Sequence, residues 1–342
     1  MNFRATLAVL LAFPILVLGC ADDGPSRPPE KGWYFLGLEQ HQVTGLELAW
    51  PYLYACTARE GLFRARVSRT NPKWHCLGLD EEWCNDVEVL ADGAILVGLT
   101  SGLQRSDDNG LTWALSDSGI RGDGDRRCRV TCFASCAGAI FAGTDQCGLY
   151  KSTDNGLSWA LIWGGPGFGY EHLQIQPHPA DCALMFNVGY SARGFNALQV
   201  SRDSGETWQG PQEAELRGFS FPSAVAVDPV DTDIAYVGTR GALFRTTDRG
   251  ESWEVVLRPP EGLWFAALAH DKEVSGHMFA AGNPYQRAAP STAPYLYETL
   301  DAGQTLEIVE TPVANPITHL LSDSSHRILF VATTGGIFKY AY

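Results

Sequence analysis

The octapeptide Ser106-Asp107-Asp108-Asn109-Gly110-Leu111-Thr112-Trp113 recurs along this chain of 342 residues. Near-exact copies span residues 152–159, 201–208 and 246–253, and a weaker copy at 299–306 ends in Leu instead of Trp. The aspartates at the third position are 46, 49, 45 and 53 residues apart. A period in the forties between strand-like flanks is typical of the blades of a propeller.

The residue types of the repeat are those of a tight hairpin. An aspartate at the third position can accept hydrogen bonds from nearby backbone N–H groups, and the glycine two residues later supplies a positive φ. The Ser or Thr holds the exit of the turn, and the Trp begins the next strand and packs between neighbouring sheets. We interpret the following residues as structural: Asp108, Gly110, Trp113, Asp154, Gly156, Trp159, Asp203, Gly205, Trp208, Asp248, Gly250, Trp253, Asp301 and Gly303.

The repeat resembles the Asp-box, also called the BNR repeat, of sialidase-type and related β-propellers. In that family the box lies on the hairpin between the third and fourth strands of a blade. The resemblance covers nearly all of residues 32–342 and implies an all-β propeller domain over that range. It identifies a fold and not a reaction.

The number of blades follows from a short strand motif, here called the strand phrase, that precedes each box; Gly102-Leu103-Gln104-Arg105 is one copy. Two further copies, at 61–64 and 336–339, lack a box, so seven phrases predict a seven-bladed β-propeller. The chain ends before a fourth strand of the last blade, whereas residues 32–38 parallel the fourth-strand segment at 73–79. We therefore predict that residues 32–38 close the ring beside the last strand, which removes exposed sheet edges. A six-bladed ring is the alternative.

The N-terminus reads as a targeting segment, with an apolar run over residues 7–18 that ends in Leu16-Val17-Leu18-Gly19-Cys20. This end resembles the bacterial lipobox, in which cleavage precedes a cysteine that is then lipidated. We expect residues 1–20 to be a lipoprotein signal peptide, Cys20 to be lipidated, and residues 21–31 to be a flexible polar tether. The mature protein would be an exported lipoprotein, in the outer membrane or facing the periplasm in a Gram-negative organism. A plain secretory signal is the alternative.

Composition limits the classes of partner. The formal charge of −14 argues against nucleic acid, and leaves a lipid anchor as the expected contact with the membrane. Eight cysteines besides Cys20 favour disulfides in an exported protein, although spacing alone does not give their pairing. The run Cys128, Cys132, Cys136 falls on an expected innermost strand and lacks the paired spacing of a zinc site. We therefore expect no metal and no cofactor.

A candidate binding face lies opposite the boxes, where loops join the second strand to the third and one blade to the next. Several of these loops are longer than ring closure needs and carry arginine and aromatic side chains, which bind anionic, sugar or peptide groups. Ordinary solvated loop residues are the alternative for each position. The predicted ligand-binding residues are Arg129, Tyr170, Tyr190, Arg193, Arg240, Tyr285 and Arg287.

Catalytic candidates are fewer. Glycoside hydrolysis needs a pair of carboxylates, and Asp86 and Glu171 fall near the same face, with His172 beside Glu171. Glu88 and Asp145 are further carboxylates there. Neighbouring residues of a strand point to opposite sides, so Glu171 and His172 are not expected to act together. Satisfied rim or strand-end residues are the alternative interpretation.

The resemblance has enzymatic and non-enzymatic branches. Sialidases carry an arginine triad, which Arg193, Arg240 and Arg287 could imitate, but their propellers have six blades. Xyloglucanase-type hydrolases use two facing propellers, and this chain has length for one. Sortilin-type receptors and photosystem II assembly-factor-like propellers form the non-enzymatic branch. The assembly-factor-like propellers are single, exported and seven-bladed, as this chain is predicted to be.

We therefore predict an envelope-anchored, non-enzymatic propeller that acts as a monomer. It would bind a protein or glycan partner through the face rich in arginine and aromatic residues. A glycoside hydrolase of sialidase-like or xyloglucanase-like type is the alternative.

Overall fold

The computed structural model describes residues 31–67, 71–122, 124, 126–167, 169–191, 198–212, 216, 221–259, 263–284 and 293–342. The expected signal peptide, with Cys20, lies outside these ranges, as does nearly all of the expected tether. The candidate residues Arg193, Tyr285 and Arg287 also lie outside the described residues.

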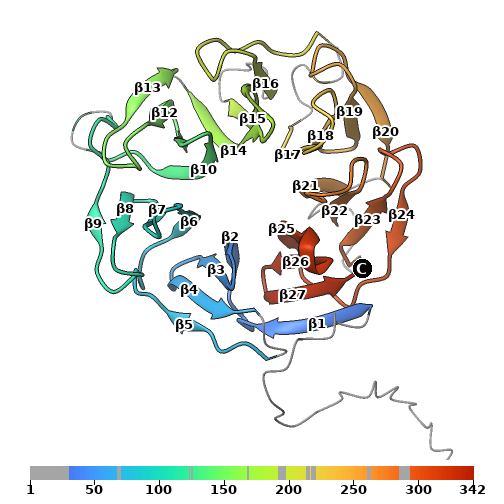
Figure 1. Cartoon of the computed structure of the whole chain (residues 1–342), viewed down its shortest axis with the longest axis horizontal. Coiled ribbons are helices and arrows are strands. Elements are labelled where there is room, and N and C mark those ends of the chain that lie inside the picture. The colour runs from blue at the N-terminus through green and yellow to red at the C-terminus, as the bar shows by residue number, and fades with distance from the viewer. Residues whose placement is uncertain are drawn as a thin grey trace, which may run out of the picture.

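Seven antiparallel sheets stand around a central axis and form a closed ring (Figure 1). From the innermost strand outwards, the first three blades are β2 (Val43–Ala49), β3 (Tyr52–Thr57), β4 (Gly61–Arg66) and β5 (His75–Cys76); β6 (Cys84–Val89), β7 (Ile95–Leu99), β8 (Gly102–Ser106) and β9 (Ala114–Leu115); and β10 (Val130–Cys136), β11 (Ala139–Thr144), β12 (Leu149–Ser152) and β13 (Ala160–Trp163).

Blades 4 to 6 are β14 (Tyr170–His178), β15 (Asp181–Ser191) and β16 (Leu198–Ser201); β17 (Ala224–Val227), β18 (Ala235–Gly238), β19 (Leu243–Thr246) and β20 (Glu254–Leu257); and β21 (Leu263–His270), β22 (Met278–Pro284), β23 (Tyr295–Thr299) and β24 (Glu307–Val309). Blade 7 is β25 (Ile317–Asp323), β26 (Ile328–Thr333), β27 (Gly336–Ala341) and β1 (Gly32–Gly37). The seven-bladed prediction is confirmed.

The N-terminal strand closes the ring as predicted. β1 pairs antiparallel with β27, and the Trp33 ring stacks on Tyr340 with centroids 5.0 Å apart. The Trp33 indole N–H also donates to the Glu310 carbonyl at 2.8 Å, which ties β1 to the preceding blade. Because the first and last strands share one sheet, opening the ring requires breaking a full ladder of backbone hydrogen bonds.

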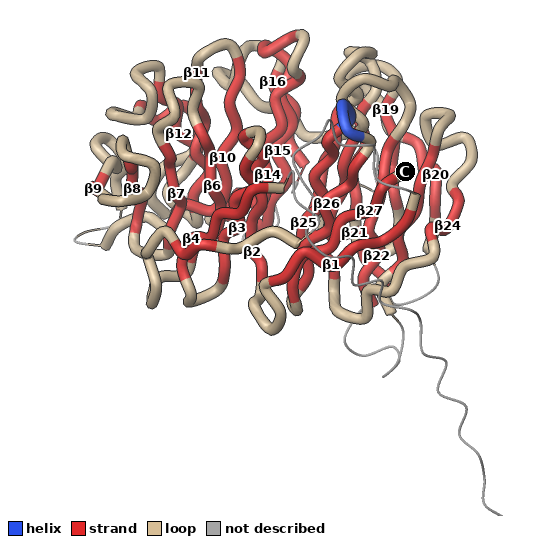
Figure 2. The backbone as a smooth tube through the Cα atoms, turned by 60° about the horizontal axis from the view of Figure 1, so that its bottom comes forward, coloured by secondary structure: helices blue, strands red, loops and turns tan. Residues whose placement is uncertain are grey.

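The described residues contain one short 3-10 helix, η1 (Ser324–His326), and otherwise strands and turns (Figure 2). No helix among them is long and apolar enough to cross a bilayer. The core consists of apolar clusters between adjacent blades. One of these clusters joins Phe186 and Val188 of β15 to Val225 and Val237 of blade 5.

The repeated turn has the same hydrogen bonds in all five copies. In the first copy, the Ser106 hydroxyl accepts from the Gly110 N–H and donates to Asp108, both at 2.8 Å. Asp108 also accepts from the N–H of Thr112 at 2.8 Å and from its hydroxyl at 2.6 Å. The same contacts recur in the other four copies.

The two side chains that organise the turn differ in burial. Asp154 is exposed and the other four aspartates are partly exposed, whereas the hydroxyl residue at the first position is buried in every copy, and Ser152 has an exposed fraction of 1%. Hydrogen bonds from Thr112, then from Ser106, lower the pKa of Asp108 to about 2. Asn109 also has a positive φ of 61°, so two consecutive residues of the turn, not the glycine alone, have a positive φ.

The repeat tryptophans fasten each blade to the one before it. The Trp113 indole donates to the Leu77 carbonyl and the Trp159 indole to the Ser116 carbonyl, each at 2.8 Å. Trp208 differs, because its indole donates to Gly205 of its own turn at 3.0 Å. Among the described residues, blade 4 has no regular fourth strand after Trp208, only an isolated bridge between Val200 and Gln209.

Candidate functional site

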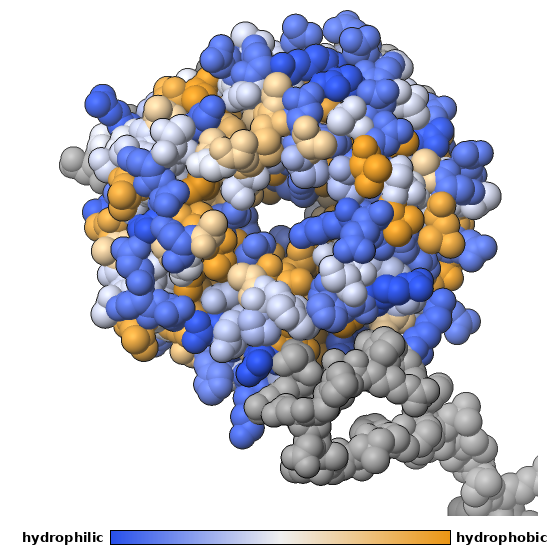
Figure 3. Space-filling model, viewed as in Figure 1, coloured by the Kyte–Doolittle hydropathy of each residue, from blue (hydrophilic) through white to orange (hydrophobic). Residues whose placement is uncertain are grey.

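The ring encloses a central channel, which Figure 3 shows from the side of the repeated turns. The face opposite the repeated turns is here called the upper face. The innermost strands begin at this face, and residues at the start of those of blades 1, 2, 3, 4 and 7 line one opening of about 260 Å³, here called the mouth. The mouth is lined by Gln42, Val43, Thr44, Trp83, Asn85, Arg129, Thr131, Glu171, Leu173, Thr318 and His319.

Arg129 crosses the mouth from blade 2 to blade 4. Its Nη2 and Nε donate to the Asn85 amide oxygen at 3.2 and 3.4 Å, and its Nη1 lies 3.3 Å from a Glu171 carboxylate oxygen. Asn85 is itself oriented by donating to the Val130 carbonyl at 2.7 Å. Two acceptors from different blades therefore hold the guanidinium of an arginine whose side chain remains 37% exposed.

The loops around Arg129 are joined covalently. The disulfide between Cys128 and Cys147 connects the segment that carries Arg129 to the loop after β11. Within that loop, the Asp145 N–H donates to the Arg129 carbonyl at 3.0 Å, and Asp145 forms a bridge with Glu171. Burial and Asp145 raise the pKa of Glu171, while Arg129 opposes the increase.

An aromatic ledge lies next to the mouth and consists of Tyr190, Phe221 and Arg240. Tyr190 is 49% exposed and stacks on Phe221, with ring centroids 6.4 Å apart and planes inclined by 9°. The Arg240 guanidinium carbon lies 5.0 Å from the centroid of the Phe221 ring. Tyr190 is the cross-strand partner of Glu171, so the ledge begins one strand away from the mouth.

Phe221 was not predicted from the sequence. Its φ of 47° is unfavourable for a bulky residue, and such strain often accompanies functional positions. A phenylalanine just before a predicted innermost strand, on the face already rich in arginine, was the available signal. Arg240 also forms a backbone bridge with Trp264, which is 37% exposed.

Two predicted site residues are interior. Tyr170 is 1% exposed and packs edge-on against Trp163 with centroids 5.2 Å apart, so its ring is not on the binding surface. His172 is 0% exposed, and its Nδ1 lies 3.1 Å from the Asn187 amide oxygen. Burial lowers the pKa of His172 to about 4, so it is neutral at pH 7 and remote from acid–base chemistry at the surface.

Asp86 lies deeper, in the wall of the central channel of about 810 Å³. One carboxylate oxygen accepts from the Phe133 N–H at 2.7 Å and the other from the Val87 N–H at 2.9 Å, so Asp86 joins blade 2 to blade 3. Gln174 has the same role between blades 4 and 5, where it accepts from the Val225 N–H at 2.9 Å. We therefore interpret Asp86 as an interblade contact.

Glu47 and Glu88 line the same channel, together with Lys272 of blade 6. Burial raises the pKa of Glu47 to about 8, and burial also raises the pKa of Glu88 and, to about 7, that of Asp86. Glu47 was missed, although aligning the first strands of blades 1 and 2 places it level with Glu88. Protonation of Glu47, and in part of Asp86, reduces the negative charge inside the ring at neutral pH.

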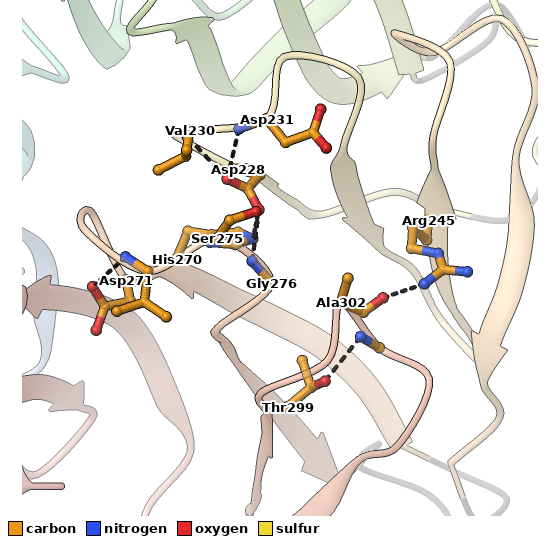
Figure 4. A network of polar contacts seen from close by, with 12 residues as sticks. Asp228, Val230, Asp231, Arg245, His270, Asp271, Ser275, Gly276, Thr299 and Ala302 are labelled. Carbon is orange, nitrogen blue, oxygen red and sulfur yellow. Dashed lines mark hydrogen bonds and ion pairs between the residues drawn. The ribbon is translucent and has the colours of Figure 1, made fainter.

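The opposite face, here called the turn face, has a structural polar network centred on Asp228 (Figure 4). This fully buried carboxylate accepts from the N–H groups of Val230 and Asp231 in its own hairpin, at 2.9 and 3.0 Å. Its other oxygen accepts from the Ser275 hydroxyl at 2.8 Å and the Gly276 N–H at 2.7 Å in blade 6. Four donors make this carboxylate a fixed link between two blades.

Within the described ranges, no group of histidine, cysteine or carboxylate side chains has the arrangement of a metal site. No family model matches the chain. A stretch of 158 residues is 25% identical to the xyloglucanase Xgh74A of Acetivibrio thermocellus and covers 40% of this chain but 19% of that protein.

Solved structures show the fold. A xyloglucanase from Xanthomonas campestris superposes with a TM-score of 0.67 and 17% identity, over 90% of this chain and 53% of its own. YCF48 from Cyanidioschyzon merolae superposes with a TM-score of 0.65 and 13% identity, over 90% of this chain and 98% of its own. YCF48 bound to a D1 peptide gives a TM-score of 0.66 at 15% identity. The chain is thus similar in fold to seven-bladed propellers, among them xyloglucanases and YCF48.

Proposed function

We propose that this chain is an envelope-anchored, non-enzymatic propeller that binds a segment of a protein partner across the mouth and the aromatic ledge. The observation that carries the proposal is the continuity of these two features. Arg129 is held at the mouth between Asn85 and Glu171, and Tyr190 extends the same surface as the cross-strand partner of Glu171.

The chemistry of this surface suits a peptide. An oriented, partly exposed guanidinium can donate to a carboxylate or a backbone carbonyl of a partner. The flat face of Tyr190 offers apolar contact area at a low cost in side-chain entropy. Tyrosine and arginine are also the residue types enriched in binding hot spots. A lipid on Cys20 would hold this surface close to membrane-associated partners.

The comparisons support the proposal in one respect. YCF48, which covers 98% of its own length in the superposition, has been solved with a bound peptide. The matched xyloglucanase is about twice as long as the part that superposes on this chain. A single ring of this size is therefore compatible with a binding module.

Crosslinking in native envelope membranes tests the proposal. We expect the wild-type chain to crosslink to a discrete protein, and Arg129→Gln to reduce the yield at least about tenfold, as the loss of a charged hydrogen bond in a hot spot would. Arg66→Gln is the matched control, because Arg66 is an exposed arginine at the turn-face end of β4. Equal loss in both variants, or no loss in Arg129→Gln, would reject the mouth as the binding surface.

A glycoside hydrolase is the second candidate, favoured by one observation. Glu171 lies at the mouth with a pKa raised by burial and by Asp145, as a general acid would require. The test is release of reducing sugars from xyloglucan and from sialylated glycans. Hydrolysis by the wild-type chain that is abolished in Glu171→Gln would replace the binding proposal with the enzymatic one.

A further inference from the structure

Two buried thiols meet where blade 1 contacts blade 2. Cys56 lies on β3 and Cys84 is the first residue of β6, and each is 0% exposed. They belong to one apolar cluster, together with Leu62 and Val97. Both are unbonded cysteines in this structure.

The backbone holds the two segments together independently of the thiols. Ala58 and Trp83 form an antiparallel bridge, which places the residues just before Ala58 beside those just after Trp83. The Thr44 hydroxyl on β2 donates to the Cys84 carbonyl at 2.6 Å, and Thr44 lies next to Gly45, the partner of Cys56 in the sheet. Proximity of the two cysteines is thus a consequence of blade packing.

The structure offers a precedent in the neighbouring blades. The disulfide between Cys136 and Cys182 joins the innermost strand of blade 3 to the second strand of blade 4. Cys84 and Cys56 also lie on an innermost and a second strand of adjacent blades, but with the order around the ring reversed, because Cys84 is on the innermost strand of blade 2 and Cys56 on the second strand of blade 1. We propose that Cys56 and Cys84 are an oxidative modification site and form a third disulfide, which links blade 1 to blade 2 covalently.

Formation of this disulfide removes two electrons from the two cysteines, and a disulfide-bearing oxidant, such as oxidised glutathione or an oxidised dithiol protein, accepts them. A thiolate of one cysteine attacks the oxidant, forms a mixed disulfide and displaces one thiolate of the oxidant. The thiolate of the second cysteine then attacks the sulfur of the first, forms the protein disulfide and releases the other half of the oxidant. The two protons lost by the cysteines end on the reduced oxidant.

Burial of the two cysteines determines at which stage of folding the disulfide can form. Burial, followed by the contact with Cys84, raises the pKa of the Cys56 thiol well above its usual range, so the folded ring contains almost no Cys56 thiolate. The bond therefore forms while blade 1 and blade 2 are still docking, and the completed ring then shields it from reductants.

Mass spectrometry of the full chain tests the proposal without any substitution. The reduced, unfolded chain is refolded with oxidised and reduced glutathione, its remaining thiols are alkylated in denaturant, and it is digested without reduction. We expect a linked peptide pair containing Cys56 and Cys84, lighter by two hydrogen atoms than the two free peptides. The pairs Cys128–Cys147 and Cys136–Cys182 are internal positive controls.

Cys132 is the matched negative control, because it is also buried but its sulfur lies 3.8 Å from the His172 carbonyl. We expect Cys132 and the exposed Cys76 to be alkylated. Alkylated Cys56 and Cys84 in a sample that contains both control disulfides would overturn the proposal. Linkage of either cysteine to a different partner would overturn it as well.

Discussion

The two faces of the ring are built in opposite ways. On the turn face, five copies of one turn repeat the same hydrogen bonds, and a buried carboxylate at Asp228 links two blades. On the upper face some turns share a threonine hydroxyl that donates to a carbonyl three or four residues later, but the side chains of Arg129, Tyr190 and Arg240 do not recur from blade to blade. Residues that recur in every blade therefore maintain the fold, whereas residues that occur in one blade are free to bind a partner.

The largest expected effect is on the turn face, at Trp159. This side chain is 5% exposed, belongs to the cluster between blades 2 and 3, and donates to the Ser116 carbonyl. We expect Trp159→Ala to lower the free energy of unfolding by about 3–5 kcal/mol, because the large cavity adds to the lost burial. Equilibrium denaturation in urea measures it, and a cost below about 1 kcal/mol would contradict the structural role.

The next effect is expected at Asp228, and it depends on pH. Burial raises the pKa of this carboxyl, but hydrogen bonds from the backbone of Asp231, Val230 and Gly276 outweigh burial and lower it. A lowered folded pKa means that the stabilisation is present above the unfolded pKa of about 3.9 and is lost as the pH falls through the folded pKa.

We therefore expect Asp228→Asn to cost about 2–3 kcal/mol at pH 7, because one carboxylate oxygen is replaced by a donor that faces other donors. The difference from wild type should begin to shrink as the pH falls below the unfolded pKa of about 3.9 and continue to shrink through the lower folded pKa, where the wild-type carboxyl also becomes neutral. Urea unfolding at several pH values measures this trend. A difference that stays constant down to the lowest pH would exclude the ionised carboxylate as its origin.

A smaller effect separates two residues of one turn. Ser152 is buried and accepts from the Gly156 N–H at 2.9 Å, so Ser152→Ala leaves a buried donor unsatisfied and should cost about 1–3 kcal/mol. Asp154 is exposed, and Asp154→Ala should cost about 1 kcal/mol or less because water replaces the lost acceptor. Thermal unfolding of both variants ranks them. The reverse order would mean that the exposed aspartate organises the turn.

The smallest expected effect on stability is on the aromatic ledge. Arg240 stacks on Phe221 at a partly exposed site, where such a contact is worth about 0.5–1 kcal/mol. We expect Arg240→Ala to change the free energy of unfolding by no more than that amount, measured by urea denaturation. A loss comparable to that of Trp159→Ala would show that the ledge is part of the core and not a binding surface.

The fold was predictable because its signals repeat. Five repeated turns and seven repeated strand motifs each predicted the same structural element. The pairing of β1 with β27 was predicted because residues 32–38 resemble the fourth-strand segment of another blade. The burial of individual site residues was not predictable. Tyr170 and Glu171 are adjacent in the sequence, yet one is interior and the other reaches the mouth, because the alternation of a strand does not reveal which side faces the channel.

The candidate site was predicted in its residue types and not in its assembly. Arg129, Glu171, Tyr190 and Arg240 were singled out separately, and only packing of the ring shows that Arg129 meets Glu171 and that Tyr190 is its cross-strand neighbour. Phe221, which connects Tyr190 to Arg240, belongs to an irregular segment without a periodic signal. Non-local contacts of this kind follow from ring closure and blade twist, which no local pattern records.

One paired measurement tests the division between the faces most directly. For Tyr190→Ala/Arg240→Ala and for Ser152→Ala, the free energy of unfolding and the yield of crosslinked partner are determined on the same preparations. We predict that the ledge variant loses the crosslinked partner while its free energy of unfolding stays within about 1 kcal/mol of wild type. We predict that Ser152→Ala loses stability and retains the partner. Loss of partner by folded Ser152→Ala, or full retention by the ledge variant, would contradict the assignment of binding to the upper face.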